Sequence, residues 1–400
     1  MKKGYLKNAL IDLVEITSEE LKHIFRDSGI MVLFLGAGLA YPILYGFVYR
    51  NEVLRNVPIA VVNKSQTPLG REFVRKVNAT PELQVAYKVN TLNEAKELFA
   101  KGKVQGIVLV PATFSEDINK GKQARVFAYS NVATMLYYRA VFLGINYVCL
   151  DMGKKIQVEN LVSTGLTARQ AEVSAAPLLY EDHALYNPDS GFASFLLPAA
   201  LILILQQTLV LGIGIAAGEA REENKYHQLI PYQKKYHGTM RIVFGKAFAY
   251  LVIYAFIGIY NLILVPHMFN LPHFLTLGTI VPLLLPFLLA TIFFGMSISI
   301  FFWDREIPFL TYLVTSIPLL LLCGYSWPAS NIHPFWKTIS YFFPSTFGIQ
   351  GFLKMNSMGA TIHQIGFECL GLWLQAGVYF IFAFFVYRWQ ILQSEKKIRK

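Results

Sequence analysis

The chain has 400 residues, of which 54% are hydrophobic and 15% are charged. Soluble globular domains have about a quarter charged residues, so this composition excludes an ordinary soluble domain and indicates an α-helical membrane protein. The formal charge of +11 would suit nucleic-acid binding, but the lysines and arginines outside residues 50–169 gather beside apolar segments. That distribution is typical of a membrane protein, and we expect no nucleic-acid partner.

Residues 1–29 are predicted to form an amphipathic helix at the cytoplasmic face of the membrane. Their apolar side chains recur among charged ones at roughly helical spacing: Leu6, Leu10, Leu13, Leu21, Ile24 and Phe25. Such a helix lies in the membrane interface, or it is a solvated helix that packs on another part of the protein. Residues 30–49 follow as the first transmembrane helix, in which Pro42 is a tolerated kink point.

Residues 50–191 are polar and differ from everything around them. Four strand-like runs alternate with helical patterns: VPIAVV at 57–62, LQVAYKV at 83–89, VQGIVLVP at 104–111 and ARVFAYS at 124–130. Thr91 and Glu94 form a capping-box pattern, and long helices are expected after Ala133. These features predict an α/β domain with long helices, inserted after the first span and extracytoplasmic.

The remainder of the membrane domain, residues 192–387, is predicted to hold five more helices. The expected spans are 192–217, 242–265, 274–302, 307–327 and 367–387. Each is long enough, at about 1.5 Å per residue, to cross a hydrocarbon layer of about 30 Å. Residues 328–366 are apolar but interrupted by prolines, which favours short re-entrant or interfacial helices on the outer face. Six spans put both termini on one side, and the basic tail 388–400 indicates the cytoplasm.

The polar segment 218–241 lies between two long apolar spans, so it must meet a face of the membrane. Lysine and arginine are frequent in it, which marks the cytoplasmic side. A plain connecting loop between the two spans is the simplest form of such a segment.

Motifs for an internal energy source are missing from the sequence. No GxxxxGK[ST] phosphate loop is present, so the chain is not expected to be an enzyme or to bind ATP itself. The three cysteines are isolated, which suggests neither disulfides nor a metal site. Glu368 is the only acid near a span, and it is either an interfacial residue or a transport residue.

Four neutral polar residues lie inside the predicted spans: Gln206, Gln207, Asn261 and Gln375. Polar side chains in lipid need hydrogen-bond partners. These four therefore either bond between helices or line a translocation path.

Six stretches carry a family resemblance, in this order: EELKHIFRDSGIMVLFLGAGLAYPILYGFVYR, VPIAVVNKSQTPLGREFV, KVQGIVLVPATFSEDINKGKQARV, LYNPDSGFASFLLP, GEAREENKYHQLI and CGYSWPASNIHPFWKTISYFFPST. Together they resemble the permease subunit of type-2 ATP-binding-cassette (ABC) exporters, in the bacterial subgroup with a large external domain after the first span. Asn224 and Lys225 stand where that family usually has Gly-Thr. Asparagine tolerates left-handed backbone, so the turn can be retained.

The resemblance implies a transport subunit of the bacterial inner membrane, driven by separate cytoplasmic ATPase subunits that bind the ATP. The residues that match the family's coupling segment are Glu219, Arg221, Glu222, Glu223, Tyr226, Leu229 and Ile230. Tyr226, Leu229 and Ile230 are expected to offer an apolar docking face. Further expected partners are a second permease copy or a sister permease in a dimer, membrane lipids, and a periplasmic adaptor as an additional candidate.

Three functions are compatible, to different degrees, with these features of the sequence. An exporter permease for a hydrophobic or amphipathic compound agrees with the spans, the missing ATP site and the coupling segment. A membrane-anchored envelope scaffold or sensor would act through the external domain alone. An ion-driven carrier is disfavoured because buried charges are few.

Overall fold

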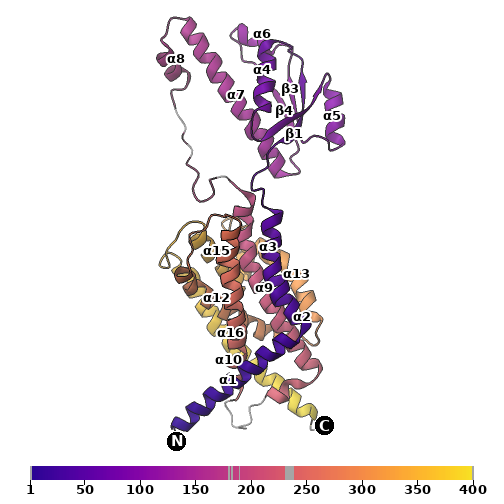
Figure 1. Ribbon diagram of the computed structural model, residues 1–400, viewed down its shortest axis with the longest axis vertical. Helices are drawn as coiled ribbons and strands as arrows, with labels where there is room; N and C mark the ends of the chain where they lie inside the picture. Colours follow the sequence, from indigo (N-terminus) through magenta and orange to yellow (C-terminus); the bar gives the residue numbers. More distant parts are fainter. Residues whose placement is uncertain (1, 179–180, 182, 189, 230–237, 399–400) are drawn as a thin grey trace. The chain divides into compact units, whose positions relative to one another are not determined.

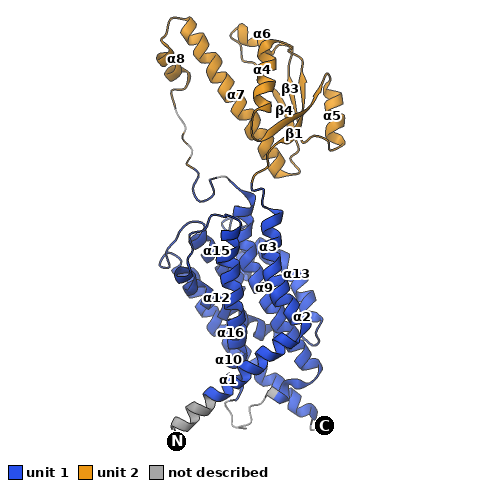
Figure 2. Cartoon of the chain, in the orientation of Figure 1, with its two compact units in different colours: residues 1–52, 184–400 blue, residues 53–183 orange. Residues whose placement is uncertain are grey.

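The computed structural model of the protein describes residues 2–178, 181, 183–188, 190–229 and 238–398. The chain divides into two compact units (Figure 2): residues 1–52 with 184–400 form the first unit, and residues 53–183 form the second. Each unit has its own hydrophobic core. The two ends of the second unit are thus connected to the first unit, which holds both ends of the chain.

Five helices of the first unit, among the described residues, are long and apolar enough to cross a membrane (Figure 1). The first is Ser28–Val48, made of α2 (Ser28–Met31), the π-helical η1 (Val32–Ala37) and α3 (Gly38–Val48), and the second is α9 (Phe192–Glu222). The third is Gly238–Met268, made of α10 (Gly238–Ile259), the π-helical η3 (Tyr260–Leu264) and α11 (Val265–Met268). The fourth is Leu277–Phe301, made of α12 (Leu277–Ile298) and the 3-10 turn η4 (Ser299–Phe301), and the fifth is α16 (Gly366–Ile398). These helices support a multi-pass membrane protein.

The sixth predicted span is shorter than expected. Its helix, α13 (Ile307–Leu322), has 16 residues, against the 21 of the predicted segment 307–327. At 1.5 Å per residue it is about 24 Å long, less than the roughly 30 Å of a hydrocarbon layer. The helix ends because Gly324 adopts a left-handed φ of 79°, a conformation that glycine takes at helix C-termini. The structure therefore does not confirm a count of six full spans.

Helix α9 is the central element of the first unit. It contacts α3, α10, α12, α13 and α15, and most of its residues from Leu197 to Gly218 are buried. The apolar run predicted a span ending at 217, but the helix continues to Glu222 because Glu, Ala and Arg are good helix formers. The first acids of the coupling segment consequently lie on the last turn of a membrane helix and not in a loop.

Helix α1 (Lys2–Arg26) packs on another part of the protein, which is one of the two alternatives left open for the N-terminus. One of its faces packs along α10, where the Thr17 hydroxyl donates to the carbonyl oxygen of Gly245 at 3.0 Å. Elsewhere on the helix, Leu10, Ile11 and Val14 are exposed. An apolar face beside charged side chains suits a membrane interface.

The proline-rich segment between α13 and α16 contains two short helices, α14 (Pro334–Ser340) and α15 (Pro344–Asn356). Helix α15 is not on the periphery, since it contacts α9, α12 and α16. Its small residues permit this: a Cβ atom at Gly348 would lie 2.6 Å from the Phe287 ring. Helix α15 is therefore part of the packed core of the first unit, whereas α14 leaves Phe335 and Trp336 exposed.

The second unit is built on a four-stranded sheet in the order β2-β1-β3-β4. The strands are β1 (Val57–Asn63), β2 (Leu83–Val89), β3 (Gly106–Val110) and β4 (Phe127–Ser130). β1 is parallel to β2 and β3, and β4 is antiparallel to β3. Each strand coincides with one of the four strand-like runs predicted from the sequence, and the ends differ by at most three residues.

Helices cover both faces of this sheet. The helices are α4 (Pro68–Asn78), α5 (Leu92–Ala100), α6 (Phe114–Asn119), α7 (Met135–Ser163) and α8 (Ala168–Ala175). α4 and α7 pack on one face around Ile59 and Val108, and α5 packs on the other around Ala60 and Ile107. Strand residues alternate between the faces, so the nearly all-apolar β1 is buried on both sides, as parallel strands usually are.

Candidate functional site

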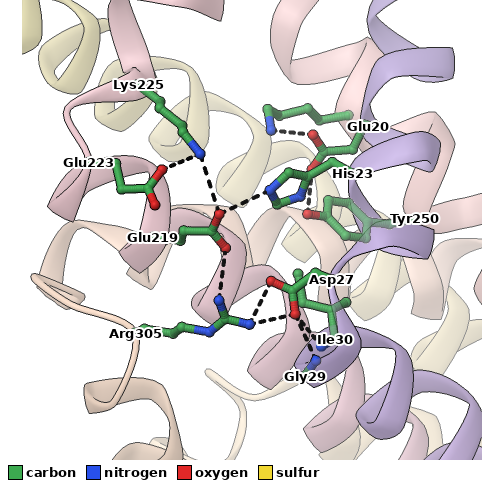
Figure 3. A network of polar contacts seen from close by, with 11 residues as sticks. Glu20, His23, Asp27, Gly29, Ile30, Glu219, Glu223, Lys225, Tyr250 and Arg305 are labelled. Carbon is green, nitrogen blue, oxygen red and sulfur yellow. Dashed lines mark hydrogen bonds and ion pairs between the residues drawn. The ribbon is translucent and has the colours of Figure 1, made fainter.

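A network of charged side chains joins the end of α9 to three other parts of the first unit (Figure 3). Its centre is Glu219, whose Oε2 accepts a hydrogen bond from Arg305 Nη1 at 3.3 Å. Its Oε1 lies 3.4 Å from His23 Nε2 and 3.6 Å from Lys225 Nζ. The Glu219 side chain is largely buried, so its charge needs such partners. One carboxylate therefore connects α9 to α1, to the 3-10 turn η2 (Lys225–Leu229) and to the loop between η4 and α13.

Arg305 extends this network to the start of the first span. Its Nη2 donates to both carboxylate oxygens of Asp27, at 2.5 and 2.6 Å. Asp27 also caps α2, since its Oδ1 accepts from the backbone N–H groups of Gly29 and Ile30. Partial burial would raise the pKa of Asp27, but the N–H of Ile30 and the Arg305 charge lower it below its usual value. Asp27 is therefore ionised at neutral pH, and Arg305 bridges two acids on different helices.

The loop that carries Arg305 reaches α9 because α9 has a glycine at the point of contact. A Cβ atom at Gly218 would lie 2.1 Å from the carbonyl oxygen of Asp304, a distance at which no side chain fits. The absence of a side chain at Gly218 thus brings Arg305 within reach of Glu219.

A second group of buried polar side chains fixes α1 on α10. Glu20 Oε2 accepts from Lys246 Nζ at 2.5 Å, and its Oε1 accepts from the Tyr250 hydroxyl at 2.6 Å. Asp12 of α1 also forms an ion pair with Arg241 of α10. Burial would raise the pKa of Glu20, but the charge and hydrogen bond of Lys246 lower it below its usual value. The N-terminal helix is therefore held to the second half of the molecule by charge as well as by packing.

Arg221 and Tyr226 point into the first unit. Arg221 Nη1 donates to the carbonyl oxygen of Ile300 at 2.7 Å, and its guanidinium lies 4.2 Å from the ring centre of Trp303. The Tyr226 hydroxyl donates to the carbonyl oxygen of Ala217 at 3.3 Å, and its ring meets that of Tyr387 edge to face. Tyr226 is only 2% exposed, so the expectation that its ring offers a docking face is wrong.

Glu222 and Glu223 are the exposed acids of the coupling segment. Glu222 makes no hydrogen bond or ion pair within the described part of the chain, while Glu223 pairs with Lys225. The hydrogen bond to Glu223 raises the pKa of Lys225. Asn224 adopts a φ of 52°, the left-handed conformation that was expected to keep the turn, and it accepts a bond from Ser394 of α16. η2 is thus held on α16, and the two glutamates project from a fixed turn.

The charged side chains of this arrangement join α9 to α1 and to the loop before α13. A model of the ABC-2 family of transporter proteins matches residues 28–385. This chain belongs to the ABC-2 transporter family. It is the membrane-spanning permease subunit of an ABC transporter, a transport subunit that implies an ATPase partner. A search of curated proteins found no match.

Two other residues expected to couple this ABC-2 permease to its partner are at the edge of what the structure describes. Leu229 is the last residue of η2. Ile230 lies outside the described residues, as do 231–237 of the coupling segment. The remaining part of that segment, from Gly238, is already helix α10.

The four neutral polar residues of the spans all bond between elements of the permease. Gln206 donates to Ser345 Oγ at 3.1 Å and Gln207 to Thr315 Oγ1 at 3.4 Å. Asn261 donates to the carbonyl oxygen of Gly38, and Gln375 to that of Tyr341. The first of the two alternatives from the sequence therefore describes all four residues.

Gln206 and Gln207 also line a pocket of about 310 Å³ between α9, α12, η4 and α13. The pocket is mainly apolar, and its other polar lining groups are Thr311, Tyr312 and Thr315. An apolar cavity with a few polar groups is the usual form of a small-molecule site. Asn261 and Gln375 do not line this pocket.

Glu368, the acid noted at the start of the last span, is buried and pairs with Lys354 of α15 at 2.5 Å. Its Oε2 has no hydrogen-bond partner among the described residues. The ion pair joins α15 to α16, and a transport role for Glu368 stays a prediction.

Sequence reasoning missed Asp27, Arg305, His23 and the Glu20–Lys246 pair. One signal was present: Asp12 and Glu20 are eight residues apart on α1, about two helical turns, so they lie on the same side of the helix. Arg305 is a single basic residue in a short loop. Its partners lie far away in the sequence, and no local pattern indicates them.

Proposed function

We propose that this permease is an exporter subunit that moves a hydrophobic or amphipathic compound out of the cytoplasm or the inner leaflet. A separate ATPase would drive it from the cytoplasmic face, and two permeases, identical or sister chains, would form the transport pathway. The proposal places it in the inner membrane of a bacterium, with the second unit outside the cytoplasm. The observation that carries it is the network centred on Glu219.

Two kinds of residue share the coupling task in this proposal. Glu222 and Glu223 are exposed on a turn held by Asn224 and Ser394, so they can meet a partner's basic side chains. Glu219 is buried behind them and joined to Arg305. A push on the turn would then reach the start of the first span through Arg305 and Asp27. A displacement at the surface thus becomes a movement of several helices together.

The pocket beside Gln206 and Gln207 is the proposed entry to the translocation path. It adjoins α9, the helix whose last turn bears Glu219, so movement of α9 would change the pocket. Its apolar walls suit a hydrophobic compound, and Tyr312 and Thr315 supply hydrogen-bonding groups.

Cytoplasmic termini require that α13 crosses the membrane. With the five long helices alone, the two termini would lie on opposite sides. We propose that α13 crosses despite its 16 residues, because a short helix can be accommodated by local thinning of the bilayer. Reporter fusions that report cytoplasmic location at both ends support this arrangement, whereas opposite locations refute it.

The decisive experiment is co-purification of the permease with an ATPase, followed by ATP-dependent transport in inside-out vesicles. The paired change Glu222→Ala and Glu223→Ala should abolish ATPase binding and transport while the protein still folds. A matched control is Glu172→Gln, an exposed acid on α8 of the second unit. Full transport by the permease alone in liposomes would refute the proposal.

A membrane-anchored scaffold or sensor remains the alternative, and the second unit with its own core favours it. In that case the same Glu222 and Glu223 changes would leave every function intact. The vesicle experiment therefore separates the two functions.

A further inference from the structure

The second unit contains a basic groove between α4 and β2, with a volume of about 550 Å³. Its cationic lining residues are Arg71, Arg75 and Lys88, and its carboxamides are Asn63, Asn78 and Asn90. Apolar residues, Val61, Val74, Val85 and Val89, complete the lining. No Asp or Glu lines the groove in the part of the chain that the structure describes.

The three cations converge because of two features of local geometry. Arg71 and Arg75 are four residues apart on α4, so they lie on one face of that helix. Lys88 joins them through a bulge: Ile59 of β1 pairs with Val85, but the next residue, Ala60, pairs with Tyr87. Ala86 is therefore an extra residue, and side-chain alternation changes after it.

The bulge determines which way Lys88 faces. Lys88 is paired with Val61, and Val61 belongs to the core beneath α4. A regular strand would continue the alternation of Leu83 and Val85 to Tyr87 and would send Lys88 to the α5 face. Bulges recur next to functional sites, where they redirect a side chain. Here the redirected side chain is a cation.

The charges in the groove are not used inside the protein. The side chains of Arg75 and Lys88 make no hydrogen bond or ion pair with any described residue, and the side chain of Arg71 donates only to the backbone oxygen of Gln66. By contrast, the neighbouring cation Lys76 on the same helix forms an ion pair with Asp151. Three uncompensated cations close together repel one another, so their arrangement costs stability unless an anion binds.

We propose that this groove binds a phosphate group, carried by a soluble phosphorylated compound or by a phospholipid. Guanidinium groups match the geometry of phosphate oxygens and bind them in pairs, and Lys88 adds a third positive charge. Carboxamides at the rim supply further N–H donors. The apolar side chains between them can contact the organic part of such a ligand. This inference does not depend on the exporter function.

The test uses the full chain in nanodiscs of neutral lipid, with isothermal titration by inorganic phosphate and by glycerol phosphate in 150 mM chloride. Co-sedimentation with phosphatidic-acid vesicles, compared with phosphatidylcholine vesicles, probes the lipid source. The groove variant is Arg71→Gln, Arg75→Gln and Lys88→Gln together. Its affinity for the phosphate probe should fall by about tenfold or more, because three charge-assisted hydrogen bonds are lost.

The matched control removes three exposed lysines on the α5 side of the sheet, by Lys96→Gln, Lys101→Gln and Lys103→Gln. It should bind like the unaltered protein, which separates the groove from non-specific attraction to basic surfaces. The single change Lys88→Gln, at an exposed residue, should weaken phosphate binding about threefold. This variant tests the groove even if the triple variant does not fold.

Binding of soluble phosphate, of phosphatidic acid, or of both supports the proposal and identifies the source. Equal losses in the groove variant and the control overturn it. The proposal is also overturned if the unaltered protein binds none of these probes.

Discussion

Arg305 donates through one nitrogen to both carboxylate oxygens of Asp27, at 2.5 and 2.6 Å, although the two residues are 278 positions apart in the chain. The same guanidinium reaches Glu219 at the end of α9. Asp27 stands at the first turn of the first span. One side chain thus links the start of one membrane helix to the end of another.

Replacing Arg305 tests this connection. Arg305→Gln leaves Asp27 and Glu219 without their shared cation, and we expect a loss of about 2 kcal/mol in the free energy of unfolding. The ATPase partner should still hydrolyse ATP, while transport falls because α9 and the first span no longer move together. Thermal unfolding and transport assays measure the two effects. Arg26→Gln removes an exposed charge next to Asp27 and is the control; an equal effect of both changes would contradict the prediction.

The acidic groups of the network predict how stability depends on pH. The folded-state pKa values of Asp27 and Glu20 lie below their ordinary values of 3.8 and 4.5. A carboxyl group with a lowered pKa stabilises the fold above its ordinary value, and this contribution is lost as the pH falls towards the folded-state value. Stability should therefore be level from pH 7 to about 5 for these groups and decline below about 4.

The change Asp27→Asn isolates one of these contributions. Its destabilisation relative to the unaltered protein should be full at pH 7 and should shrink as the pH falls below 3.8 towards the lower folded-state pKa, because only below that folded-state pKa is Asp27 protonated in both states. Unfolding midpoints measured in pH steps give the comparison. A difference that stays constant down to pH 2 would show that the Asp27 charge does not stabilise the fold.

The buried pair of Glu20 and Lys246 should show strong coupling. Lys246→Met leaves the carboxylate of Glu20 buried with only the Tyr250 hydroxyl, and such unpaired charges cost about 3 kcal/mol. Adding Glu20→Gln removes that charge, so the double variant should be more stable than Lys246→Met alone. Thermal unfolding of the two single variants and the double variant gives the interaction energy. Additive effects would mean that the pair contributes no mutual stabilisation.

The membrane helices could be predicted from the sequence because long apolar runs directly reflect the thickness of a bilayer. Hydropathy marks where lipid ends, however, and not where a helix ends, which is why α9 continues through Glu219 to Glu222. The early end of α13 depends on the left-handed backbone of Gly324, a local conformation that the apolar run conceals.

The candidate site was only half predictable for a related reason. Glu219, Glu222 and Glu223 stand out because they interrupt apolar sequence. Which of them is exposed is a property of the tertiary structure, as the pairing of Glu219 with Arg305 shows. Tyr226 is an aromatic residue of the kind that often docks a partner, but it is buried against Tyr387. No local sequence pattern predicts that Tyr387 lies there.

The pocket beside α9 predicts a change in substrate preference. Gln207 lines it and donates to Thr315, so Gln207→Leu removes a polar group and makes the pocket more apolar. Transport of more hydrophobic compounds should be favoured over polar analogues by about threefold to tenfold, while ATP hydrolysis is unchanged. Gln375→Leu, a polar change outside the pocket, is the control. The same shift in both variants would argue against a substrate role for the pocket.

The contact between α9 and the loop before α13 supplies a steric test. Gly218→Ala places a methyl group 2.1 Å from the carbonyl oxygen of Asp304. The loop must move, and overpacking of this kind costs about 1 to 3 kcal/mol. Because Arg305 follows Asp304, the movement should also separate Arg305 from Glu219 and lower transport. Gly377→Ala in α16 is the matched control, since nothing lies within 4 Å of the added atom and alanine favours a helix by about 0.5 to 1 kcal/mol. Unfolding and transport measurements on both variants decide the matter: normal transport by Gly218→Ala would mean that the close approach of loop and helix is not needed for coupling.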